Sequence, residues 1–406
     1  MSRRSDAVTR ALADVPVPGA GAAEQRARGV VLDVFEEREP VPARRRRSGL
    51  RLALGVAGAA LVAGAAVASP GGETIQRFVR DVVVAAKGRQ LPAAPMRLPG
   101  GGNLLVRAPL GSPSALWVLH ADGSRTLLGR YRDGSWSPHA RFVVATAGHR
   151  LVALDPHTGK VHWSITAPAP VRGARWSLEP TVPPCCRVAY LTAGTLRIVA
   201  GDGSGDRELA PADAKAAPAW RPGDHRRALA YVDRAGAVRL VSADSGAALA
   251  IPYHRGFRPT LLAWSTDGRR LLAMNAVRLV VLDASLRQMG AIRRPPSELG
   301  SYVSAAFAPR GHALIVLRRL GPRQRARVEL LRPGHPPRAL ETLVGDLSGL
   351  APSPDGRNVL VGWGAADQWL LVPLRAGTRA RRVTGLAEAF GSTAVPVANA
   401  WARSGR

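Results

Sequence analysis

The stretch LLAWSTDGRRLLAMN, residues 261–275, holds two apolar runs separated by a short polar turn. Short apolar runs bounded by turn residues are typical of buried β-strands. Asp267 and Gly268 supply the geometry of a tight turn between the two runs. Two further apolar runs follow, so we predict a unit of four short strands: Leu261–Trp264, Leu271–Asn275, Arg278–Asp283 and Leu286–Ile292.

Imperfect copies of this phrase recur along the chain at a nearly constant spacing. An aromatic anchor, or Pro in one copy, precedes each polar turn: Trp136, Trp176, Trp220, Trp264, Phe307 and Pro352. Successive anchors lie 40, 44, 44, 43 and 45 residues apart. Four short strands repeated at this period are the signature of β-propeller blades. We expect each anchor ring to fill the seam between neighbouring blades rather than to stack on a ligand.

The two ends of this region predict how the ring closes. Trp401 begins a seventh copy of the phrase, but no further strand follows it. The apolar runs between Asn103 and Arg130 form three strands that lack an inner partner. Joining the last strand to these three removes two open sheet edges. We therefore predict an all-β fold over residues 103–406, a seven-bladed propeller with four-stranded blades, while six or eight blades stay open alternatives.

The repeats resemble the WD-like repeats of TolB-type β-propellers, in which Trp or Phe, Ser, Pro, Asp, Gly and a basic residue precede a strand. APSPDGRNVL (351–360) matches this turn closely, and AWSTDGRRLL (263–272) differs at one turn residue. LDPHTGKVHW (154–163) is similar to the outer hairpin of quinoprotein-type propellers. The resemblance covers about residues 104–406 and implies the fold. It says little about function, because propellers host enzymes, binders and scaffolds alike.

An uncharged apolar segment, Leu52–Ala68, precedes the propeller. As a helix it would span about 26 Å, close to the ~30 Å hydrocarbon core of a bilayer. Arg44–Arg47 and Arg51 lie before it, and Glu73 is the first charge after it. The positive-inside rule therefore predicts a cytoplasmic N-terminus and an external propeller. A signal peptide cleaved after Ala68, which implies secretion, and a buried soluble helix are the open alternatives.

We divide the chain into four parts: 1–48, a cytoplasmic segment with an amphipathic helix; 49–68, a transmembrane helix; 69–102, an amphipathic helix and a Pro/Gly linker; and 103–406, the propeller. Apolar residues recur at helical spacing between Ala27 and Phe35. A lone amphipathic helix cannot bury its apolar stripe. We therefore expect the membrane surface or a cytoplasmic protein partner to cover it.

The formal net charge of +28 comes almost entirely from Arg, since the chain has three lysines. Such a charge suggests a polyanionic partner such as phospholipid headgroups or wall polymer. Arg-rich composition without a dedicated partner is the alternative. No recognition motif accompanies the charge, so nucleic acid is not an expected partner.

Strand direction alternates within a blade, which predicts two faces of different charge. The first face carries the connections between first and second strands and between third and fourth strands. It receives seven aspartates: Asp155, Asp202, Asp206, Asp244, Asp267, Asp283 and Asp355. The second face carries the remaining connections, and two of its loops predict a basic, partly aromatic surface for a protein or polyanion: Tyr253, Arg255, Phe257, Arg258, Arg318, Arg319, Arg323 and Arg325.

The sequence contains no catalytic motif that we recognise. It lacks a Gly-x-Ser-x-Gly elbow, and its nine histidines are scattered, so we predict no catalytic residue, cofactor or metal ion. GDGSGDRE (201–208) loosely resembles a calcium loop but lacks the distal Glu, which favours a plain turn. The adjacent Cys185 and Cys186 are expected to be buried thiols rather than a strained disulfide ring.

These features predict a single-pass bacterial membrane protein whose external propeller acts as a binding or sensing module. The layout is similar to that of membrane-bound anti-sigma factors with external sensor domains, which implies signalling through residues 1–48. Those residues lack the zinc-binding His-Cys motif of that group. A propeller enzyme (hydrolase, lyase or quinoprotein-like) and a TolB-like envelope scaffold are the alternatives.

Overall fold

The computed structural model describes residues 98–109, 114–177, 186–223, 227–293, 300–321, 325–375 and 377–402. All of them lie within one compact unit, 83–406. The predicted cytoplasmic segment, the apolar segment and nearly all of the linker lie outside the described residues and stay predictions. No helix in the described part of the chain has the length and apolar character needed to cross a membrane.

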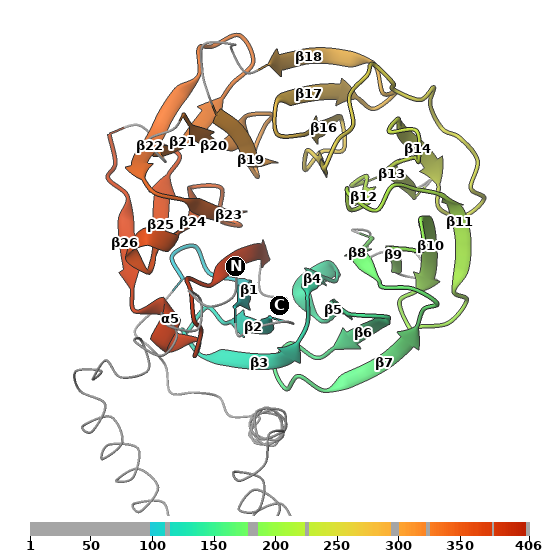
Figure 1. Cartoon of the computed structure of the whole chain (residues 1–406), viewed down its shortest axis with the longest axis horizontal. Coiled ribbons are helices and arrows are strands. Elements are labelled where there is room, and N and C mark those ends of the chain that lie inside the picture. The colour runs from blue at the N-terminus through green and yellow to red at the C-terminus, as the bar shows by residue number, and fades with distance from the viewer. Residues whose placement is uncertain are drawn as a thin grey trace, which may run out of the picture. The chain divides into compact units, whose positions relative to one another are not determined.

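Seven antiparallel sheets surround a central axis (Figure 1). We number the sheets as blades in chain order and give their strands from the axis outward. Blade 1 is β4 (Asp133–Trp136), β5 (Val143–Ala147), β6 (Arg150–Leu154) and β7 (Val161–Thr166). Blade 2 is β8 (Arg172–Trp176), β9 (Arg187–Thr192), β10 (Thr195–Ala200) and β11 (Arg207–Pro211). Blade 3 is β12 (Ala219–Trp220), β13 (Ala228–Val232) and β14 (Val238–Ser242).

The next three blades each contain four strands. Blade 4 is β15 (Leu261–Trp264), β16 (Arg270–Met274), β17 (Arg278–Asp283) and β18 (Gln288–Arg293). Blade 5 is β19 (Gly300–Phe307), β20 (Leu314–Leu320), β21 (Arg325–Leu331) and β22 (Arg338–Val344). Blade 6 is β23 (Leu347–Pro352), β24 (Asn358–Trp363), β25 (Gln368–Pro373) and β26 (Arg381–Thr384).

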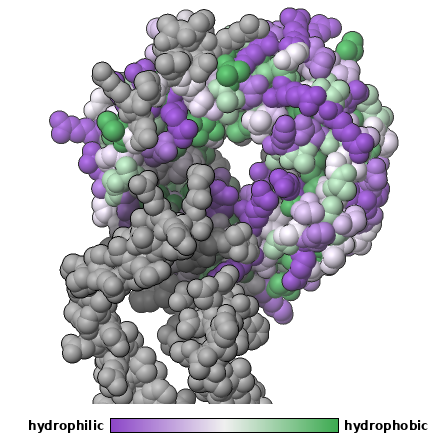
Figure 2. All heavy atoms as spheres, viewed as in Figure 1, coloured by the Kyte–Doolittle hydropathy of each residue, from purple (hydrophilic) through white to green (hydrophobic). Residues whose placement is uncertain are grey.

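Blade 7 joins the two ends of the propeller. Its inner strand is β27 (Val397–Ala402), and its outer strands are β1 (Asn103–Ala108), β2 (Ala115–Leu119) and β3 (Arg125–Arg130). β27 pairs antiparallel with β1, with Trp401 opposite Leu104. β27 also contacts β23 and β4, the inner strands on either side. The predicted seven blades and their closure are confirmed. In the space-filling view, hydrophilic residues gather around an opening at the centre of the ring (Figure 2).

Blade 3 corrects the expectation that every blade has four strands. After β14 the chain makes only isolated bridges, Val241 to Ala248 and Val238 to Tyr253. Pro252 lies in this segment and cannot donate a backbone hydrogen bond, which disfavours a continuous outer strand.

Short helical turns occupy three connections. They are η2 (Pro138–Ala140), η3 (Gly364–Ala366) and α5 (Leu386–Ala389). α5 connects blade 6 to β27, and Leu386 and Phe390 at its ends are fully buried. Phe390 packs against Trp117 of β2 and Trp369 of β25, so one apolar cluster spans blades 6 and 7.

The anchor rings lie in the seams between blades, as predicted. Trp136, Trp176, Trp220 and Phe307 are buried, whereas Trp264 and Trp401 are half-buried. In three seams the indole Nε1 donates to the carbonyl that precedes the anchor of the previous blade: Trp264 to Ala219 (3.1 Å), Trp220 to Arg175 (2.9 Å) and Trp136 to Ala400 (3.1 Å). Trp401 instead donates to Gly101 at 2.8 Å. In these three seams the Trp therefore both fills the seam and hydrogen-bonds across it.

The polar turn after Trp264 also has a structural role. The Oγ of Ser265, which is fully buried, accepts the N–H of Arg270 at 3.0 Å and donates to Oδ1 of Asp267 at 2.6 Å. The same oxygen of Asp267 accepts the N–H of Arg269 at 3.1 Å, and Gly268 has a φ of +65°. The Ser353 turn repeats these bonds. Ser and Asp recur because their side chains accept the backbone N–H groups of the turn, and Gly recurs because it adopts the positive φ that the turn requires.

We expect acid to weaken this turn. The hydrogen bond from Ser265, together with those from Arg269 and from His312 of blade 5, lowers the pKa of Asp267 to about 2. Ionised Asp267 therefore stabilises the fold above about pH 4, and this contribution is lost as the pH falls toward 2. The carboxylate is 42% exposed, so we expect Asp267→Asn to cost less than about 1 kcal/mol at pH 6. The difference in urea midpoint between this variant and wild type should shrink as the pH falls from about 4 to about 2, and a constant difference would contradict the assignment.

Candidate functional site

The structure corrects the predicted aromatic exposure on the second face. Tyr253 and Phe257 are both buried in the core between blades 3 and 4. The Tyr253 hydroxyl donates to Gln288 at 2.8 Å, and the Arg278 guanidinium lies 5.3 Å from the Phe257 ring. The two rings replace the missing outer strand of blade 3 as packing groups, so they offer no surface to a ligand.

The predicted arginines of this face have different environments. Arg318 is largely buried, with Nη1 3.3 Å from Glu329 and its guanidinium over Tyr302. Arg319 pairs with Asp346 at 2.8 Å. The other described members, Arg255, Arg258 and Arg325, are exposed. Arg323 lies outside the described residues. A surface for a polyanion on this face stays a prediction. It now comprises the exposed Arg255, Arg258 and Arg325.

We expect the triple variant Arg255→Ser, Arg258→Ser, Arg325→Ser to bind anionic vesicles at least about tenfold more weakly than wild type, since each basic residue near an anionic surface contributes about 1 kcal/mol. A matched control removes three exposed arginines of the first face, Arg287, Arg310 and Arg357. Cosedimentation with phosphatidylglycerol vesicles measures both. Equal weakening in the two variants would show that net charge, and not this face, determines binding.

A cavity of about 490 Å³ opens on the first face between blades 1 and 2. Its walls come from the connection between β4 and β5, from β6 and the start of β7, from the end of β8, from the residue before β9, and from the turn between β10 and β11. The lining residues are Ser137, Pro138, His139, Arg141, Phe142, Ala153, His162, Trp163, Trp176, Cys186, Gly201 and Asp202. Sequence analysis did not identify this cavity.

Two glycines shape the aromatic wall of the cavity. A Cβ on Gly203, whose φ is +88°, would lie 2.9 Å from the Trp163 ring. A Cβ on Gly201 would lie 3.0 Å from the Trp176 ring. Nε1 of Trp163 donates to the Gly201 carbonyl at 2.8 Å, and the two indoles meet edge to face at 6.4 Å. The GDGSG segment therefore holds both rings in place by close backbone approach.

Strained and unsatisfied groups gather at this cavity. His139 and Ala140 have φ values of 58° and 54°, and Cys186 has 68°. Such values are uncommon for residues other than glycine, and they cluster at functional sites. Nε1 of the buried Trp176 has no hydrogen-bond partner among the described residues, whereas Nε1 of Trp136, Trp220 and Trp264 each has one. These departures from the blade pattern mark this seam as specialised.

The cysteine prediction is wrong for the residue that the structure describes. Cys186 is disulfide-bonded and lies in the wall of the cavity rather than being a buried thiol. Cys185 lies outside the described residues. Trp176 and the half-buried Trp163, whose rings contact each other, line the same wall as Cys186, so aromatic surroundings accommodate its sulfur.

The acidic residues of the adjacent turn are already engaged. Oδ1 of Asp202 accepts the N–H and hydroxyl of Ser204, at 2.9 and 2.7 Å. Asp206 accepts the Tyr190 hydroxyl at 2.8 Å and pairs with Arg197 at 3.1 Å. Burial and the Asp206 hydrogen bond raise the pKa of Tyr190 above its ordinary value. Within the described ranges, no three His, Cys, Asp or Glu side chains meet to hold a metal ion.

The lining of the cavity is suited to binding an aromatic or apolar group. Its floor offers aromatic and apolar contact from Phe142, Trp163 and Trp176, and His139 and Arg141 are exposed at its rim. Ser137 accepts the N–H of Phe142 at 2.8 Å and thus belongs to the blade turn. Such a surface can hold a planar apolar group and contact a polar substituent at the rim.

Comparisons with known proteins support the fold alone. No family model and no curated protein matches the chain. The β-propeller domain of Cps50 (Swd1) from Myceliophteria thermophila is similar over 66% of this chain and 95% of its own, with 15% identity and a TM-score of 0.51. A hydrazine synthase of Kuenenia stuttgartiensis aligns over 59% of this chain and 76% of its own, with 14% identity and a TM-score of 0.49. At such identities, what this chain shares with the Cps50 domain is the β-propeller architecture.

Proposed function

We propose that the propeller is a binding module whose ligand occupies the cavity between blades 1 and 2. The observation that carries the proposal is the aromatic wall of Trp163, Trp176 and Phe142. Two further lining residues, His139 and Cys186, have a left-handed backbone conformation. A ring with one specialised seam and repeated structural seams is typical of a scaffold that carries a single site on a rigid frame. The ligand class is a planar or aromatic group with a polar substituent.

We further propose that residues 49–68 anchor the propeller outside the membrane and that residues 1–48 act in the cytoplasm. The arginines before the apolar segment support this orientation through the positive-inside rule. Ligand binding outside the membrane and an amphipathic helix inside it would together form a sensor. Fractionation combined with N-terminal sequencing distinguishes this anchor from a leader cleaved after Ala68.

Binding of 8-anilinonaphthalene-1-sulfonate, a planar aromatic probe, tests the cavity. We expect saturable fluorescence with wild type and at least fivefold weaker binding with Trp163→Ala. Trp363→Ala is the matched control, because Trp363 is also half-buried and its Nε1 donates to a carbonyl, that of Val344, at 2.9 Å. Equal binding by both variants, or no binding by wild type, would overturn the proposal.

A further inference from the structure

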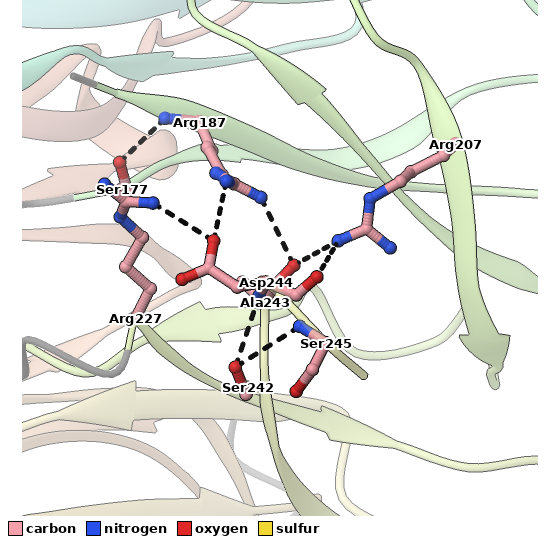
Figure 3. Close-up of polar contacts among 8 residues, drawn as sticks. All are labelled: Ser177, Arg187, Arg207, Arg227, Ser242, Ala243, Asp244 and Ser245. Atoms are coloured by element: carbon pink, nitrogen blue, oxygen red, sulfur yellow. Dashed lines mark hydrogen bonds and ion pairs between the residues drawn. The ribbon is translucent and has the colours of Figure 1, made fainter. Parts of the chain in front are cut away.

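Three arginines converge on one aspartate at the next seam, between blades 2 and 3 (Figure 3). Asp244 follows β14 on the first face, and its Oδ1 lies 2.6 Å from Nη2 of Arg187 and 3.0 Å from Nη1 of Arg227. Nη2 of Arg207 donates to the carbonyls of Ala243 and, at 2.8 Å, Asp244. Guanidinium groups from β9, from β11 and from the residue before β13 therefore all contact the segment that follows β14.

Among the described residues, guanidinium groups outnumber carboxylates at this point. Arg187 and Arg227 share the Asp244 carboxylate, while Arg207 contacts the backbone beside it. Burial lowers the pKa of Arg187, Asp244 opposes this shift, and Arg227 and Arg207 add to it. The nearest acidic turn does not compensate, since Asp206 is paired with Arg197 and Asp202 lines the aromatic cavity. An additional anion would relieve the repulsion among the arginines.

The backbone around the cluster is strained as well. Arg227 has a φ of 48° and Cys186, next to Arg187, has 68°. Such conformations are unfavourable for residues other than glycine, and they cluster at functional sites. Arg187 and Arg227 both contact the Asp244 carboxylate from this backbone.

A small cavity gives access to two of these arginines. It measures about 220 Å³ and is lined by Cys186, Arg187, Ile198, Ala200, Ser204, Gly205 and Arg207. Among the described residues, Nη2 of Arg207 has partners, whereas its Nε and Nη1 have none. The cavity therefore combines a guanidinium with unused donors, a second guanidinium and the polar turn at Ser204.

We propose that this small cavity binds a phosphate group. Tetrahedral oxyanions accept several donors at once, and paired guanidinium groups match their geometry. This cavity shares Cys186 with the aromatic cavity but takes Ser204 and Gly205 of the turn rather than Gly201 and Asp202, and its proposal does not depend on the function proposed above. Its ligand is a phosphate group, free or carried by a larger molecule.

Isothermal titration with inorganic phosphate at low salt tests the proposal on the full chain. We expect saturable binding and at least tenfold weaker binding by Arg207→Gln. Arg234→Gln is the matched control, because Arg234 also donates to a backbone carbonyl, that of Gly194 at 3.1 Å, but on the second face. Trp163→Ala should retain phosphate binding, so failure of the aromatic site is distinguished from failure of this one.

A second pair of variants leaves the arginine contacts intact. Gly205 has a φ of +63° and open space around its Cβ position, and Asp and Asn both tolerate this conformation. Gly205→Asp should abolish phosphate binding by placing a carboxylate beside the cavity, and Gly205→Asn should preserve it. Absence of wild-type binding at millimolar phosphate, or equal binding by the Asp and Asn variants, would overturn the proposal.

The source of the phosphate group is tested by two further arms. Glycerol 3-phosphate is a soluble phosphate ester, and phosphatidylglycerol vesicles carry phosphate at a membrane surface. Competition with inorganic phosphate by the soluble ester alone assigns the site to a free ligand, and competition by vesicles assigns it to a lipid headgroup. In both cases the soluble ester or the vesicles should no longer compete with inorganic phosphate when the protein carries Arg207→Gln. Competition that survives this substitution would contradict the site.

Discussion

A chain that ends at Pro396 is expected to lose the folded propeller altogether. This truncation removes β27, the only partner of β1 on its inner side. It also exposes the closing cluster around Trp369, whose Nε1 donates to the Pro396 carbonyl at 2.6 Å. An open ring has two unpaired sheet edges and an uncovered core. We expect no cooperative transition in thermal circular dichroism and an expanded or aggregated species in size-exclusion chromatography.

The matched control ends at Ala402 and keeps every pair between β1 and β27. It should melt cooperatively at a temperature close to that of the full chain. Adding a synthetic peptide of residues 394–402 to the shorter truncation should restore part of the transition. A compact and cooperative protein ending at Pro396 would show that the ring does not need its last strand.

The second large effect concerns the seam anchors. We expect Trp220→Ala to lower the free energy of unfolding by about 3–5 kcal/mol, which is typical of a buried aromatic ring replaced by Ala. The ring is 5% exposed, and its Nε1 bonds to Arg175 across the seam at 2.9 Å. Urea unfolding followed by fluorescence gives the difference.

Two Phe substitutions separate ring volume from the hydrogen bond. Trp220→Phe and Trp176→Phe remove similar volume from buried seams, but within the described part of the chain only Trp220 has a hydrogen-bond partner for its Nε1. We expect Trp220→Phe to be the more destabilising by about 1 kcal/mol, the usual net contribution of one hydrogen bond. Equal losses would indicate that the indole bonds stabilise the seams no more than packing does.

The blade count and its closure could be predicted because both depend on local, repeated chemistry. Trp264, Ser265 and Gly268 each serve a role within a few residues or at the adjacent blade, and the period carries that role around the ring. The predicted strand Arg278–Asp283 matches β17 in both bounds. The copy of the repeated phrase that begins at Trp401, together with the three strands between Asn103 and Arg130 that lack an inner partner, was enough to place β27.

The cavity could not be predicted, because its walls come from several short segments spread between Ser137 and Asp202 and its special features are conformational. The left-handed backbone conformation at His139 and Cys186 cannot be recognised from the residue type at either position. Burial of Tyr253 and Phe257 was missed for a related reason. Their neighbours Arg255 and Arg258 suggested a surface loop, whereas the absence of a fourth strand in blade 3 turns both rings inward.

The pairing of β1 with β27 also determines when the protein can finish folding. The ribosome releases the last strand only after some 300 residues of propeller have been made, so the ring stays open throughout synthesis. During that interval β27 is absent. The inner edge of β1 and the inner position of blade 7 are therefore accessible to wrong partners. A chaperone that shields the nascent chain until termination would therefore raise the yield of closed rings more than one that acts after release.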